Sequence, residues 1–173
     1  MLLGGSKTDH LFLLEDLETH LDELRALGVN YVRNTMSQRE DPGLKAHQLL
    51  PDGRFDLDKW NKDYWIRFEN MLRWTAERDI IVQIEVWDRF DFTDANEWNI
   101  WQESPWRPAN NMNYTTNESG LADRYADHPA ADKQPFFHTI PGLPLYQPSL
   151  DKIRLYQEAF VTKMLSYSLD YGH

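Results

Sequence analysis

The sequence predicts an α/β fold built on a parallel sheet, and two observations along its 173 residues favour this class. Segments with apolar residues at helical spacing alternate with short runs of β-branched residues, an order typical of parallel strands joined by helices. The range 88–148 interrupts this order: it has no sustained period and contains seven of the nine prolines. Loops of that length inside a compact domain are uncommon and are usually functional.

The first predicted helix covers 14–27 and ends before Gly28, because five leucines recur there at helical spacing: Leu14, Leu17, Leu21, Leu24 and Leu27. A short strand follows over 29–36. The range 37–53 is polar and contains the turn residues Pro51, Asp52 and Gly53, so it is predicted to be a turn region.

A second helix, capped by Asp58 or Asn61, is predicted to reach about Arg78. The run of β-branched residues over 80–87 predicts a strand whose apolar side is covered by helices. After the long loop, Ser149 is the predicted cap of a third helix that ends near Gly172.

This order, with a further strand considered around Leu2 and Leu3, predicts a partial (β/α)8 barrel. A complete barrel takes about 250 residues. The chain is therefore expected to be a single N-terminal fragment over 1–173, comprising roughly three β/α units with a long loop after the third strand. A doubly wound sheet is the alternative, although no Gly-x-Gly-x-x-Gly run follows a strand.

Charge and composition exclude several classes of partner. The net charge is −10 and the basic residues do not cluster, which argues against nucleic acid and anionic membranes. No apolar run approaches the roughly 20 residues that a membrane span needs. The chain has no cysteine, its six histidines lack metal-ligand spacing, and no cofactor is predicted. The start resembles no signal peptide, so a secreted or periplasmic location would require a signal that precedes the fragment.

The ends of the two strands carry the first candidate site residues. Strand alternation places Arg33 on a polar face, where it needs a carboxylate partner, and Glu85 is one candidate. Trp87 and Asp88 end the second strand. Because parallel strands end at the same edge of a sheet, Arg33, Trp87 and Asp88 are expected to share a pocket beneath the long loop.

The long loop is rich in side chains that stack on sugar rings or form hydrogen bonds with them. The predicted substrate-binding set combines them with the strand ends: Arg33, Asn34, Trp87, Asp88, Trp98, Trp101, Asn111, Asn113 and Tyr114. Each of these residues also has a structural interpretation. The tryptophans can pack the loop against itself, the asparagines can hold turns, and Asp88 can cap the next turn.

The run from Gly28 to Asn34, GVNYVRN, resembles the second-strand signature Gly-x-Asn-x-x-Arg of the cellulase-like retaining glycoside hydrolases, which share a (β/α)8 barrel. Three further segments resemble members of that clan: 3–6 (LGGS), 52–57 (DGRFDL) with Trp60 and Asn61, and 80–88 (IIVQIEVWD). The likeness extends from about Leu3 to Tyr171. It departs at Trp87 and Asp88, where many relatives have a histidine.

The resemblance implies that Arg33 lies beside a catalytic nucleophile. It also implies two catalytic glutamates, after strands four and seven, and retaining chemistry places them about 5–5.5 Å apart. By this register both glutamates would lie beyond His173. No catalytic residue is therefore assigned, and the chain alone is expected to be inactive.

The resulting functional hypothesis is the N-terminal fragment of a glycoside hydrolase that acts on O-glycosidic bonds of a poly- or oligosaccharide. Its expected partners are the carbohydrate and the remainder of its own barrel. The alternative is a non-catalytic carbohydrate-binding or pseudoenzyme barrel. A phosphate-handling barrel is disfavoured, because its phosphate site follows strands seven and eight.

Overall fold

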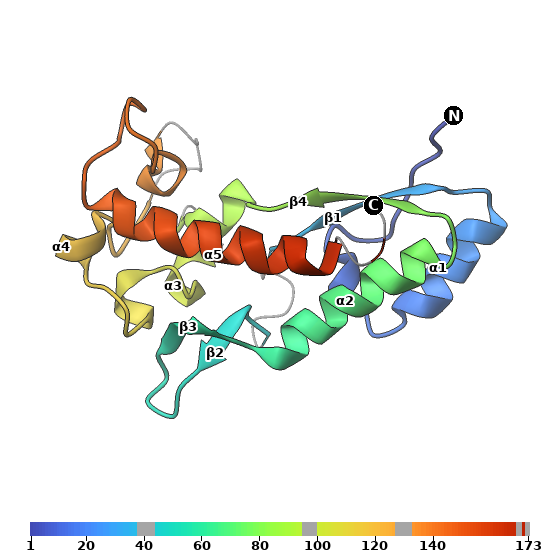
Figure 1. The fold of residues 1–173 in the computed structure, drawn as a ribbon, viewed down its shortest axis with the longest axis horizontal. Coiled ribbons are helices and arrows are strands. Elements are labelled where there is room, and N and C mark those ends of the chain that lie inside the picture. The colour runs from blue at the N-terminus through green and yellow to red at the C-terminus, as the bar shows by residue number, and fades with distance from the viewer. Residues whose placement is uncertain (38–43, 95–99, 127–132, 169–170, 172–173) are drawn as a thin grey trace.

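Two parallel strands and two helices form one end of the molecule (Figure 1). The computed structural model describes residues 1–37, 44–94, 100–126, 133–168 and 171. This end contains, in chain order, the 3-10 turn η1 (Leu11–Leu13), α1 (Leu17–Ala26), β1 (Tyr31–Thr35), α2 (Lys62–Ala76) and β4 (Ile81–Glu85). The predicted helices and strands in these ranges are confirmed, each with shorter bounds.

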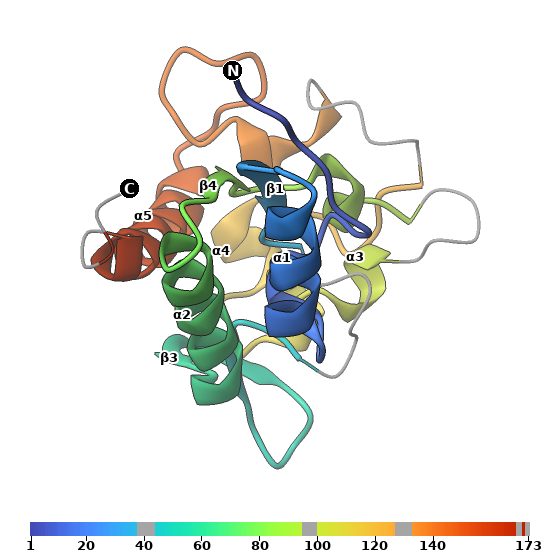
Figure 2. The ribbon, with the colours of Figure 1, turned by 90° about the vertical axis from the view of Figure 1, so that its right-hand side faces the viewer.

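The pairing of β1 with β4 is parallel and in register from Tyr31 opposite Ile81 to Thr35 opposite Glu85. Gly4 adds an isolated parallel bridge to Tyr31 on the outer side of β1. Helices α1 and α2 cover one face of this pair (Figure 2). The core between them is apolar and consists of residues such as Phe12, Leu17, Leu21, Val32, Phe68 and Leu72.

A β-hairpin that the sequence did not predict lies within and after the expected turn region. Strand β2 (His47–Leu49) pairs antiparallel with β3 (Phe55–Trp60). The turn between them depends on Gly53, whose φ of 85° is left-handed, and on Asp52, whose carboxylate accepts a hydrogen bond from the Arg54 backbone at 3.0 Å. Strand β2 is only three residues long, and the alternation of apolar and polar residues in β3 is limited to Phe55, Asp56, Leu57 and Asp58.

The prediction of a partial (β/α)8 barrel is wrong. The described residues form two separate two-stranded sheets, β1–β4 and β2–β3, and neither is closed. The region near Leu2 and Leu3 supplies only the single bridge at Gly4. The predicted helices and parallel strands are present, but the order of elements does not determine how many strands join one sheet. The chain is a small α/β fold.

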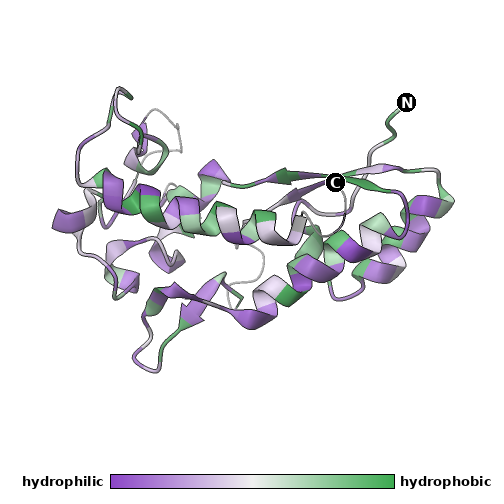
Figure 3. Ribbon diagram, in the orientation of Figure 1, coloured by the Kyte–Doolittle hydropathy of each residue, from purple (hydrophilic) through white to green (hydrophobic). Residues whose placement is uncertain are grey.

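Where the structure describes the segment after β4, it folds into short helical turns and no further strand. They are η2 (Arg89–Phe92), α3 (Ile100–Glu103), η3 (Pro108–Asn110), α4 (Thr116–Ser119) and η5 (Pro135–Phe137). Helix α5 (Leu150–Ser168) follows and lies across this region. Ile153 and Phe160 of α5 are buried, whereas Leu155 and Leu165 are exposed, so apolar residues occur around the helix (Figure 3).

His47 lies at the centre of an aromatic cluster that joins the hairpin to the long segment. Its ring stacks on Trp60, with centroids 4.9 Å apart, and meets Trp106 edge-on at 5.4 Å. Burial lowers the pKa of His47 to about 4, against the opposing effect of the Asp56 carboxylate. The imidazole is therefore neutral in the folded protein at pH 7.

We expect His47 to make the fold less stable in mild acid. Between its unfolded pKa near 6.5 and its folded pKa near 4, only the unfolded chain takes up the proton, so stability falls as the pH falls. From pH 7.5 to pH 5 this costs about 2 kcal/mol. Urea unfolding at both pH values should show a smaller loss for His47→Phe. An equal loss in both proteins would contradict this assignment.

Asp79 is the single described non-glycine residue with positive φ, at 55°, just after α2. Glycine adopts this conformation without strain, and a carboxylate near a helix C-terminus is unfavourable. Asp79→Gly should therefore raise the free energy of unfolding by about 0.5–1 kcal/mol, measured by urea denaturation. Asp79→Ala removes the charge but keeps the strain, so it should not share the gain. Equal gains in both variants would mean that charge alone is the cause.

Candidate functional site

The carboxyl ends of β1 and β4 open onto a cavity of about 580 Å³, here called the strand-end cavity. The two strands are parallel and in register, so their polar side chains reach the same edge. Nine of the described residues line it: Asp9, Arg33, Thr35, Glu85, Trp87, Asp88, Arg89, Phe90 and Phe137. Five of them can carry a charge and three are aromatic.

Arg33 organises the polar wall of this cavity. Its guanidinium lies 2.5 Å from the Asp9 carboxylate and 3.7 Å from Glu85. Thr35 donates a hydrogen bond to Glu85 at 2.9 Å, which fixes the second carboxylate. The hydrogen bond to Asp9 and the charges of Asp9, Glu85 and Asp88 raise the pKa of Arg33. The side chains of Arg33 and Glu85 are 45% and 42% exposed, so their remaining polar atoms can reach a ligand.

Trp87 and Asp88 form the junction between this wall and the long segment. The Trp87 ring packs against Phe160, Phe136 and Trp106, with centroid distances of 4.8, 5.2 and 5.6 Å. Asp88 accepts a hydrogen bond from the Phe90 backbone at 2.8 Å and so begins η2. The indole is half-buried, so part of it faces the cavity while neighbouring rings hold it in place.

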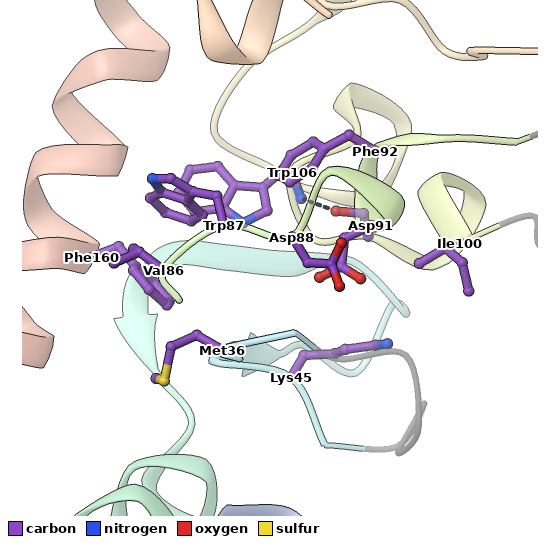
Figure 4. A pocket seen from close by; sticks show the side chains of 11 residues that line it. Met36, Lys45, Val86, Trp87, Asp88, Asp91, Phe92, Ile100, Trp106 and Phe160 are labelled. Carbon is purple, nitrogen blue, oxygen red and sulfur yellow. Dashed lines mark hydrogen bonds between the residues drawn. The ribbon is translucent and has the colours of Figure 1, made fainter. Parts of the chain in front are cut away.

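A second, smaller cavity lies beside Trp87 and Asp88, as Figure 4 shows. Its volume of about 20 Å³ is close to the space of one water molecule. Lys45, which is 6% exposed, lines it together with Asp88 and Asp91. Ser37 donates a hydrogen bond to Asp91 at 2.7 Å. A buried ammonium is favourable only near carboxylates, and these two are close by.

Three of the predicted site residues meet as the sequence indicated. Arg33, Trp87 and Asp88 all line the strand-end cavity. Asn34 does not reach it, because alternation along β1 turns its side chain to the opposite face. There it is fully buried and accepts a hydrogen bond from the Phe12 backbone at 3.2 Å.

The described candidates from the long loop do not line this cavity. Trp101 is fully buried, and its indole N–H donates to the Ala122 carbonyl at 3.0 Å. The Tyr114 hydroxyl is buried and donates to the Trp106 carbonyl at 2.8 Å. These contacts stabilise the loop itself. Trp98 lies outside the described residues.

Asn111 and Asn113 hold the loop in shape. Asn111 is buried; its amide donates to the carbonyls of Pro105 and Arg107, and its oxygen accepts from the backbones of Asn113 and Tyr114. Asn113 accepts from the Leu57 backbone at 2.8 Å and donates to Asp58 at 2.9 Å, which ties the loop to β3. Both asparagines satisfy backbone or neighbouring groups within the protein.

Five cavity residues were not identified from the sequence: Asp9, Thr35, Arg89, Phe90 and Phe137. Asp9 reaches Arg33 because the Thr35 backbone donates to the Asp9 carbonyl at 2.7 Å. Arg89 and Phe90 come within five residues of the end of β4, so their position was a usable signal. Phe137 comes from a distant part of the chain, and no local pattern marks it.

The described ranges contain no group of three histidine, cysteine, aspartate or glutamate side chains arranged to hold a metal ion. In the same part of the chain, no helix has both the length and the apolar character needed to cross a membrane. Comparisons with protein-family models, curated proteins and solved structures found no match. Functional inference therefore rests on the cavity and on the sequence resemblance.

The contacts of Asn111 give a stability test of its structural role. Asn111→Ala would leave buried backbone groups without partners, so the free energy of unfolding should fall by about 2–3 kcal/mol. Asn113→Ala, at a more exposed position, should cost about 1 kcal/mol. Urea denaturation of both variants measures the difference. Wild-type stability in Asn111→Ala would show that this network does not hold the loop.

Proposed function

We propose that the strand-end cavity binds a saccharide and that the chain is the binding part of a glycoside hydrolase. The observation that supports this most is the half-buried Trp87 indole beside the polar array of Arg33, Asp9 and Glu85. The hydrolase assignment itself rests on the sequence resemblance described above.

The chemistry of the two walls matches that of a sugar ring. A pyranose has apolar C–H faces that lie against aromatic rings, and Trp87, Phe90 and Phe137 provide such rings. Its hydroxyl groups both donate and accept hydrogen bonds. Carboxylate oxygens accept them and guanidinium N–H groups donate them. The cavity volume of about 580 Å³ lies within the usual range for small ligands.

Binding without hydrolysis is the expected activity of this chain. Retaining hydrolysis needs one carboxyl group as acid and another as nucleophile, on either side of the bond. Asp9 and Glu85 both form ion pairs with the Arg33 guanidinium, and the Asp88 carboxylate accepts a hydrogen bond from the Phe90 backbone. In these contacts the three carboxylates hold neighbouring groups in place and do not serve as acid or nucleophile.

A titration with neutral oligosaccharides tests the proposal. Cellotetraose, xylotetraose and mannotetraose would be added to the purified chain, with binding followed by calorimetry and tryptophan fluorescence. At least one should bind. Arg33→Gln should weaken binding about tenfold, because it removes charge-assisted hydrogen bonds, and Trp87→Ala should weaken it by loss of the stacking ring. Product analysis should show no hydrolysis.

Trp74→Ala is the matched control, because this indole is also half-buried but lies on α2, away from the cavity. It should leave saccharide binding unchanged. Thermal melting of each variant separates loss of the site from loss of the fold. Absence of binding to every oligosaccharide, or equal binding by the folded Arg33→Gln protein, would overturn the proposal.

A further inference from the structure

A third cavity lies between the end of β3, the first turns of α2 and the C-terminal half of α5. Its volume is about 630 Å³. We call it the lysine groove and define it by Trp60, Lys62, Trp65, Lys163 and Tyr167. The C-terminal end of α5 lies next to α2 in Figure 1, and these two helices line the groove together with β3.

Aromatic rings form the floor of the lysine groove. Trp65 and Tyr167 are stacked, with centroids 5.9 Å apart and planes at 13°. Trp60 meets Trp65 edge-on at 5.4 Å and is supported from behind by the stacked His47 ring. Trp65 is held further by its indole N–H, which donates to the Ala46 carbonyl at 3.1 Å. The floor is therefore rigid, while Trp60 and Tyr167 stay partly exposed.

Two lysine ammonium groups lie beside these aromatic rings. The Lys163 ammonium lies 4.5 Å from the Tyr167 ring centroid and 5.9 Å from that of Trp65. Lys62 is exposed in the first turn of α2. Among the described residues, no carboxylate lies within ion-pair distance of either lysine. A third lysine, Lys59, is already paired with Asp56 at 3.0 Å.

The carboxylates that line the groove have partners of their own. Asp58 accepts a hydrogen bond from Asn113 at 2.9 Å, and Glu69 accepts one from the Tyr171 hydroxyl at 3.2 Å. In a chain with a net charge of −10, an aromatic floor whose lining has three lysines and two carboxylates is a local exception. The lysine groove can therefore bind a negatively charged group that is attached to a flat ring.

We propose that the lysine groove binds a carboxylate carried on a ring. The ring lies against Trp60 and Tyr167, and the carboxylate accepts hydrogen bonds from Lys62 and Lys163. Two kinds of molecule have this chemistry, an aromatic acid and an acidic sugar. The site is separate from the strand-end cavity, since the two share no lining residue, so it does not depend on saccharide binding there.

The test compares charged ligands with neutral analogues of the same shape. The aromatic pair is 4-hydroxycinnamate and 4-hydroxycinnamamide, and the sugar pair is trigalacturonate and galactotriose. Binding would be measured by calorimetry and by ligand-observed NMR. At least one acid should bind about tenfold more tightly than its neutral partner, with a preference that shrinks as salt is raised. The pair in which the acid binds more tightly than its neutral analogue shows whether the groove prefers an aromatic acid or an acidic sugar.

Matched variants separate this site from general charge effects. Lys62→Gln combined with Lys163→Gln should abolish the preference for the acid, whereas Lys152→Gln, which removes a lysine beside Glu118, should retain it. All three lysines are at the surface, so melting temperatures should change little. Equal binding of acid and neutral analogue, no binding of either acid, or an unchanged preference in the double variant would overturn the proposal.

Discussion

The parallel pairing of β1 with β4 is the constraint on which the first site depends. Because Thr35 lies opposite Glu85, Arg33 and Glu85 extend from the same face near the same edge. The opposite face carries Val32 and is covered by α1 and α2. A shift of the register by one residue would send the charged side chains into the apolar core and the valine into solvent. The free energy gained by burying the apolar face therefore fixes the register of the strands and, with it, the geometry of the cavity.

The helices and parallel strands could be predicted because each has a local signal. The leucine spacing before Gly28, the Asn61 cap and the β-branched run before Trp87 all identify real elements. The barrel could not be established in the same way. Barrel closure depends on which strands pair across the whole chain, and periodicity reports only which side of one element is apolar. The hairpin of β2 and β3 was missed because β2 has only three residues and the alternation in β3 covers only four.

Strand geometry predicted which residues meet in the strand-end cavity, whereas residue type alone did not. Arg33, Trp87 and Asp88 were placed by the shared edge of parallel strands, and they meet in one cavity. Trp101, Asn111 and Tyr114 were selected because their side chains suit sugars. The same side chains also suit a long irregular segment, whose buried backbone groups must find partners. Within this loop, composition cannot separate the two uses.

The two sheets also differ in the length of chain that must be organised before they form. The hairpin joins neighbouring residues through a tight turn at Gly53. In contrast, the contact of Thr35 with Glu85 spans 50 residues, so its formation carries a large loop-closure entropy. Contacts of high sequence separation slow folding. The hairpin can therefore form early and independently, while the charged wall of the strand-end cavity is assembled only in the step that also closes the main core.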